Sequence, residues 1–104
     1  MPREEENIAE FANFLASDAG APLRIDGIQW MAGALRDEAS TRRWRRNGTG
    51  DSLVSLLDTT LTRDTAEWSK NREAREAVLA IAAYLVARHV DAALTLQERI
   101  KQLR

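Results

Sequence analysis

The sequence predicts an all-α protein, and three observations carry this prediction. Residues 77–87, AVLAIAAYLVA, contain no charge and no strong hydrogen-bonding side-chain group except the Tyr84 hydroxyl. Other segments place apolar residues at the three- and four-residue spacing of an amphipathic helix. No segment sustains the alternation of apolar and polar residues that marks a strand. We therefore expect five to six helices in antiparallel pairs, as a compact bundle or a short α-solenoid around residues 77–87, with that segment buried on all sides.

The first two helices are predicted on either side of residues 18–23, DAGAPL. The first covers residues 3–17, with three glutamates in its first turn, where the helix dipole favours negative charge. Its apolar face consists of Ile8, Phe11, Ala12 and Leu15. The second begins near Asp26, which has capping-box spacing to Gln29. Its buried stripe consists of Ile28, Met31, Ala32 and Leu35.

Two further features of the second helix concern its N-terminus and its glycines. Ile25 and Trp30 have the spacing of a hydrophobic staple, which would fix the entry of the chain into the helix. Gly27 and Gly33 each weaken a helix by about 1 kcal/mol relative to alanine. We expect these glycines to allow a close crossing with another helix.

The remaining helices follow the turn NGTG at residues 47–50. A third helix is predicted over residues 52–61, with an apolar face of Leu53, Val54, Leu56, Leu57 and Leu61. Asp64 and Glu67 form another capping box. The polar gap at residues 69–73 and a cap at Asn71 favour a short fourth helix and a separate fifth over one long helix to Arg88. The short turn at residues 89–91 makes the last two helices antiparallel neighbours, with Asp91 as the last cap and an inward stripe of Ala92, Leu96, Ile100 and Leu103.

Length and composition limit the class of protein. The chain has 104 residues, of which 44% are hydrophobic and 30% charged, with a net charge of −1; this is typical of one soluble globular domain, here residues 1–104. The absence of cysteine excludes disulfides and thiolate chemistry. The acidic N-terminus argues against a secretory signal, and the longest apolar run is shorter than the roughly 20 residues that span a bilayer. We expect a cytoplasmic protein without membrane contact.

The segment TRRWRR, residues 41–46, is the most suggestive candidate site. Arginines at this density attract phosphate backbones, and an aromatic ring between them stacks on bases. The net charge is slightly negative, however, and three acidic residues lie close in sequence. We therefore favour a solvated helix end whose arginines form salt bridges within the chain or to an acidic protein partner, and keep nucleic-acid binding or a small anionic ligand as alternatives. The residues concerned are Arg42, Arg43, Trp44, Arg45 and Arg46.

The three tryptophans, Trp30, Trp44 and Trp68, are candidates for core or interface positions. Tryptophan dominates binding hot spots, so any that is exposed is a candidate anchor for a partner. Trp68 stands in the most polar surroundings, EWSKNRE, and is therefore predicted to lie at an interface.

Catalytic chemistry finds little support in the sequence. His89 is the only histidine. It is predicted to lie at a helix C-terminus, where the helix dipole favours a cationic side chain, so a metal site is not needed to explain its presence. The carboxylate pairs have arginine neighbours on solvated helix faces, the serines lie in no nucleophile elbow, and NGTGDS lacks the spacing and lysine of a P-loop. We expect no enzyme, no metal and no cofactor.

The back half, in GTGDSLVSLLDTTL and REAVLAIAAYLVARHVDAALTLQERI, resembles a piece of an α-solenoid of the HEAT or armadillo kind. The resemblance implies a scaffold or partner-binding surface, and similar segments form helical tails of large bacterial proteins. A closed six-helix bundle, as in death-fold adaptor domains, fits the same pattern. Both interpretations imply a binding module that engages a protein partner, with homo-oligomerisation left open.

Overall fold

The chain folds into six α-helices and one short 3-10 helix, with no strand among the described residues. The computed structural model describes residues 4–41 and 49–102, and the side chains of residues 8–36 and 50–102. The predicted all-α class is confirmed. The elements are α1 (Glu4–Ala16), η1 (Ala21–Leu23), α2 (Arg24–Thr41), α3 (Thr49–Arg63), α4 (Thr65–Ser69), α5 (Arg72–Ala87) and α6 (Ala93–Gln102).

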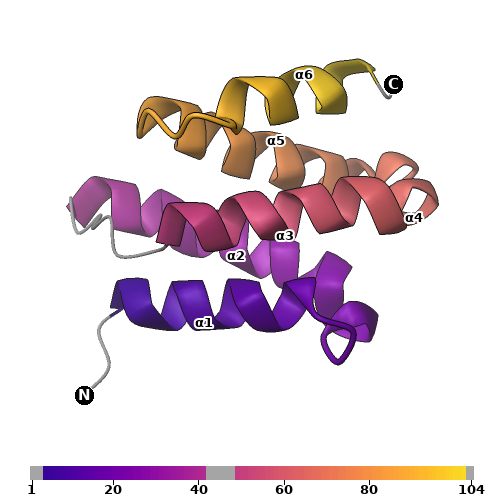
Figure 1. Cartoon of the computed structure of the whole chain (residues 1–104), viewed down its shortest axis with the longest axis horizontal. Coiled ribbons are helices and arrows are strands. Elements are labelled where there is room, and N and C mark those ends of the chain that lie inside the picture. The colour runs from indigo at the N-terminus through magenta and orange to yellow at the C-terminus, as the bar shows by residue number, and fades with distance from the viewer. Residues whose placement is uncertain (1–3, 42–48, 103–104) are drawn as a thin grey trace.

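The long helices run in alternating directions along the chain, so that successive ones are antiparallel (Figure 1). α1 packs against α3, and α3 also contacts α6, whereas α2 packs mainly against α5. The helices therefore form two layers, α1–α3–α6 and α2–α5. An ion pair of 2.7 Å between Arg99 of α6 and Asp58 of α3 joins these two helices of the first layer.

The predicted apolar faces form one continuous core. Each stripe predicted for α1 and α2 is buried apart from Phe11, which is half-buried. Leu53, Leu56, Leu57 and Leu61 of α3 are buried as well, and Val54 packs at the edge. On α6 the inward stripe starts at Ala93, because the helix begins there and the exposed Ala92 precedes it.

The central helix α5 is not buried on all sides, contrary to the prediction. Ala77, Val78, Ile81, Ala82 and Leu85 are buried, but Ala83 and Ala87 are exposed. Both exposed positions are alanines, whose small side chains leave little apolar area in water. The exposed side of α5 therefore needs no covering helix.

The caps predicted at Asp26 and Asp64 do not form as expected. α2 begins at Arg24, because η1 with Pro22 in its first turn leads straight into it, so Asp26 lies in the first turn of α2 and is not its cap. Asp64 does occupy the N-cap position of α4, but its side chain makes no capping hydrogen bond. The cap predicted at Asn71 is confirmed: its side chain accepts a 3.1 Å hydrogen bond from the Ala74 amide, and α4 and α5 are separate helices.

Two glycines allow close packing at the corner between α1 and α2. A Cβ on Gly20 would collide with the backbone of Phe14 and Leu15. A Cβ on Gly27 would lie 2.5 Å from both methyl groups of Leu15, so the close helix crossing predicted there is confirmed. At Gly33 that prediction is wrong, because no atom lies within 4 Å of the corresponding position.

Candidate interaction surface

The side of α2 that faces away from the core carries an exposed tryptophan. With 3.6 residues per turn, Gln29, Trp30, Gly33 and Arg36 fall on one side of this helix; we call these four residues the α2 outer face. Trp30 is 58% exposed, the most exposed aromatic side chain described. An exposed indole on a helix surface is costly to leave in water and is typical of a binding anchor.

Aromatic side chains of α1 hold Trp30 in place. Phe11 meets the Trp30 ring edge-to-face with ring centroids 5.2 Å apart, and Phe11 and Phe14 are stacked at 6.4 Å. Phe14 is itself 40% exposed. Such aromatic pairs contribute about 0.5–1.5 kcal/mol beyond the area they bury. The result is a preorganised apolar surface along the seam of α1 and α2.

Gly33 lies at the centre of the α2 outer face. It is one turn from both Gln29 and Trp30 on one side and from Arg36 on the other. The space above its Cα is open. A glycine inside a helix costs about 1 kcal/mol relative to alanine, and packing within the described chain offers no compensation here. The opening lets another backbone or a large side chain approach α2 closely.

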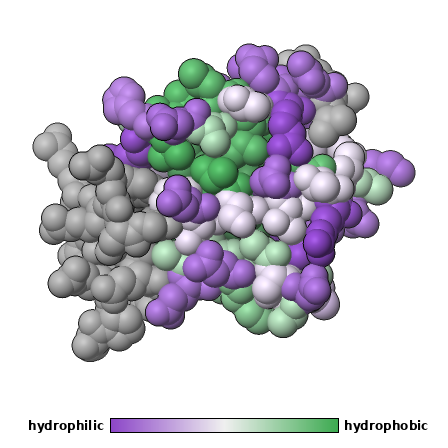
Figure 2. All heavy atoms as spheres, viewed as in Figure 1, coloured by the Kyte–Doolittle hydropathy of each residue, from purple (hydrophilic) through white to green (hydrophobic). Residues whose placement is uncertain are grey.

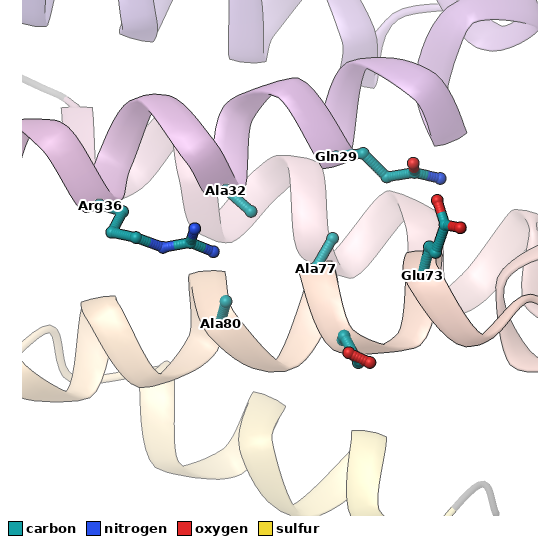
Figure 3. A pocket seen from close by; sticks show the side chains of 7 residues that line it. Gln29, Ala32, Arg36, Glu73, Ala77 and Ala80 are labelled. Carbon is teal, nitrogen blue, oxygen red and sulfur yellow. The ribbon is translucent and has the colours of Figure 1, made fainter.

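A groove between α2 and α5 adjoins this face (Figure 3). It encloses about 220 Å³. Ala32, Ala77 and Ala80 form its floor, and polar side chains form its rim. Gln29 and Glu73 lie towards one end and Arg36 towards the other (Figure 3). The rim residues are Gln29, Arg36, Glu73 and Glu76.

The charged side chains on the rim of this groove form few ion pairs with other described residues. Glu76 lies 3.8 Å from the strongly exposed Arg72, an ion pair of little energetic weight. Within the described part of the chain, Arg36 and Glu73 make no ion pair and no side-chain hydrogen bond. Their charges are therefore available to a molecule that enters the groove.

Trp68, predicted to lie at an interface, is fully buried, and that prediction is wrong. Its helix α4 packs against α3 and α5, and the ring is part of the core. The polar residues around it in sequence project from a five-residue helix, so one large side chain points inward while its neighbours face solvent. The predicted cluster Arg42, Arg43, Trp44, Arg45 and Arg46 lies outside the described residues.

Trp30 was not predicted as the surface tryptophan, because its staple spacing to Ile25 suggested a packed role. The signal was present in the helical pattern. Trp30 lies off the stripe formed by Ile28, Met31 and Leu35, and a residue off the buried stripe faces solvent.

A second apolar surface lies where α3, α5 and α6 meet on the face shown in Figure 2. Leu94, in the first turn of α6, is 63% exposed, and Val90 before it is half-buried. Both of these side chains are aliphatic and neither supplies an aromatic anchor, which makes this surface the weaker candidate for a specific contact.

The described residues provide no group of three His, Cys, Asp or Glu that could hold a metal ion. None of the described helices is both long and apolar enough to span a membrane. Comparisons of the chain with models of known families, with curated proteins and with solved structures find no match.

Proposed function

We propose that this chain is a non-enzymatic protein-interaction module that docks its partner on the α2 outer face and the adjoining ring of Phe14. The observation that carries the proposal is the 58% exposure of Trp30 together with its edge-to-face contact to Phe11. A tryptophan that is already held in one orientation loses little conformational entropy on binding, which favours affinity.

The chemistry of the surroundings supports a protein partner. A specific interface combines a central apolar anchor with a polar rim, and here Trp30 lies beside the charged groove between α2 and α5. The groove has an apolar floor of three alanines, against which a partner side chain can pack. The stacked antiparallel helix pairs are in keeping with a scaffold role, as the HEAT or armadillo resemblance implies.

The arginine cluster at residues 42–46 follows α2 directly in the sequence. In this proposal it supplies a second, electrostatic contact to an acidic surface of the same partner, which would speed association. Nucleic-acid binding through these arginines is the alternative, and the salt dependence of binding to DNA and RNA distinguishes the two.

Site-specific photocrosslinking tests the proposal. The photoreactive residue p-benzoylphenylalanine replaces Trp30 in the full chain, which is expressed in its native host and irradiated. We expect a discrete covalent adduct with protein. The control carries the same residue at Lys70, an exposed position on the turn between α4 and α5, and a third variant carries it at Leu94. Absence of an adduct at position 30, or equal adducts at position 70, would refute the proposal; adducts at position 94 alone would move the site to α6.

A further inference from the structure

We infer that the partner seated on the α2 outer face is a second copy of this chain, with the two α2 helices antiparallel. The inference rests on the proposed function and names its partner. It is carried by the opposite charges of the groove between α2 and α5, which complement themselves under a two-fold rotation.

The groove has opposite charges at its two ends. Arg36 lies at one end, whereas Glu73 lies beside Gln29 at the other (Figure 3). Positions 29 and 36 are seven residue steps apart, which corresponds to about 10 Å along the helix. In a two-fold symmetric dimer every contact occurs twice, with residue i of one copy on residue j of the other. A two-fold axis near Ala32 therefore brings Arg36 of each copy to Glu73 of the other.

A partner of uniform charge fits this face less well. An acidic surface or a phosphate backbone would meet the carboxylates of Glu73 and Glu76 as well as the single guanidinium of Arg36. Like charges brought together at an interface are strongly unfavourable. The mixed signs within one groove therefore favour a partner that carries the same two signs in reversed order, which a second copy does.

Sedimentation equilibrium of the purified full chain tests the inference. We expect a reversible monomer–dimer equilibrium. Arg36→Glu and Glu73→Arg should each raise the dimer dissociation constant at least about tenfold, and the double variant should restore it to within a few-fold of the original. Lys101→Glu and Glu98→Arg, exposed positions on α6, change the net charge equally and should leave the dissociation constant unaltered.

A purified chain that stays monomeric at all concentrations would overturn the inference, as would a dimer insensitive to the charge reversals at Arg36 and Glu73. The proposed function fails separately. Crosslinking of position 30 to a different protein, with a monomeric purified chain, would remove the second copy as partner and leave the interaction module. No crosslinking at position 30 together with a monomeric chain would remove both.

Discussion

Arg24 and Asp64 form a buried ion pair of 3.0 Å that joins three helix ends. The Arg24 side chain is 1% exposed, and its Nε and Nη2 groups donate hydrogen bonds of 2.7 and 3.2 Å to the carbonyls of Leu15 and Ser17. These carbonyls lie at the end of α1, where helical C=O groups lack intrahelical partners. Arg24 thereby fixes the end of α1 to the start of α2 and to the N-cap of α4. This corner fixes how α1 packs against α2, the two helices between which Phe11 contacts Trp30.

Replacing Arg24 by methionine should lower the free energy of unfolding by about 3–5 kcal/mol, because Asp64 would keep a largely buried charge and the Leu15 carbonyl would lose its side-chain donor. Urea denaturation of both proteins measures the difference. Arg63→Met is the matched control, since Arg63 pairs with Asp18 at the same 3.0 Å distance but with both side chains mostly exposed. It should cost no more than about 1 kcal/mol. Equal costs for the two variants would contradict the central role of Arg24.

Trp68→Ala should destabilise the fold by about 3–5 kcal/mol, since it empties a fully buried site between α4 and the core. Trp30→Ala removes an exposed ring and its contact with Phe11, and should cost about 1 kcal/mol or less. Denaturant unfolding, followed by far-ultraviolet circular dichroism so that the readout does not depend on tryptophan, gives both values. A small cost at Trp68 would restore the original prediction that this residue is a surface anchor.

The buried stripes could be predicted from sequence because they depend on local periodicity alone. Ile28, Met31 and Leu35 are buried whatever their helix packs against. The role of Arg24 could not be predicted, since it depends on Asp64, forty positions further along the chain. An arginine before an apolar stripe is typical of a solvated helix start, and only the tertiary fold surrounds it with acceptors.

The candidate site was the harder part to predict, for a related reason. The polar neighbours of Trp68 in the sequence suggested that its ring is exposed. Trp68 lies on a short helix that packs against α3 and α5, and there the exposure of a side chain depends on tertiary packing and not on its sequence neighbours. The groove between α2 and α5 joins Arg36 and Glu73, which are far apart in sequence. No local pattern connects them.

Gly27→Ala and Gly33→Ala should change stability in opposite directions. At Gly27 the new methyl group would lie 2.5 Å from both methyl groups of the fully buried Leu15, so the crossing of α1 and α2 must widen, at a cost of about 1–3 kcal/mol. At Gly33 the methyl group meets open space and improves helix propensity by about 1 kcal/mol. Thermal and urea unfolding of the two variants at low protein concentration measure the effects. A stabilised Gly27→Ala variant would show that Leu15 can move aside.

His89→Gly should stabilise the protein by about 1 kcal/mol. His89 has a φ of 60°, in the left-handed region that follows α5, and the amides of His89 and Val90 donate to the carbonyls of Val86 and Leu85 at 3.0 and 3.1 Å. This is the Schellman arrangement, in which glycine is the favoured residue. His89→Asn should give a smaller gain, because asparagine tolerates this conformation better than most residues, and His89→Ala should give none. Urea denaturation ranks the three; an alanine variant as stable as the glycine variant would contradict the backbone explanation.

The full chain should not bind DNA or RNA in the salt-dependent manner of a phosphate-binding protein. Its net charge is −1, and Asp37, Glu38 and Asp51 flank the arginine cluster in sequence. A protein that neutralises several phosphates loses affinity steeply as salt rises. Gel-shift titrations at two salt concentrations measure the affinity for single- and double-stranded DNA and RNA. The comparison is a variant in which glutamine replaces Arg42, Arg43, Arg45 and Arg46. Binding that weakens steeply with salt, and that is lost in the glutamine variant, would establish the nucleic-acid alternative. If the arginines instead engage an acidic partner, the same variant should show weaker crosslinking from position 30 in cells while its unfolding free energy stays unchanged.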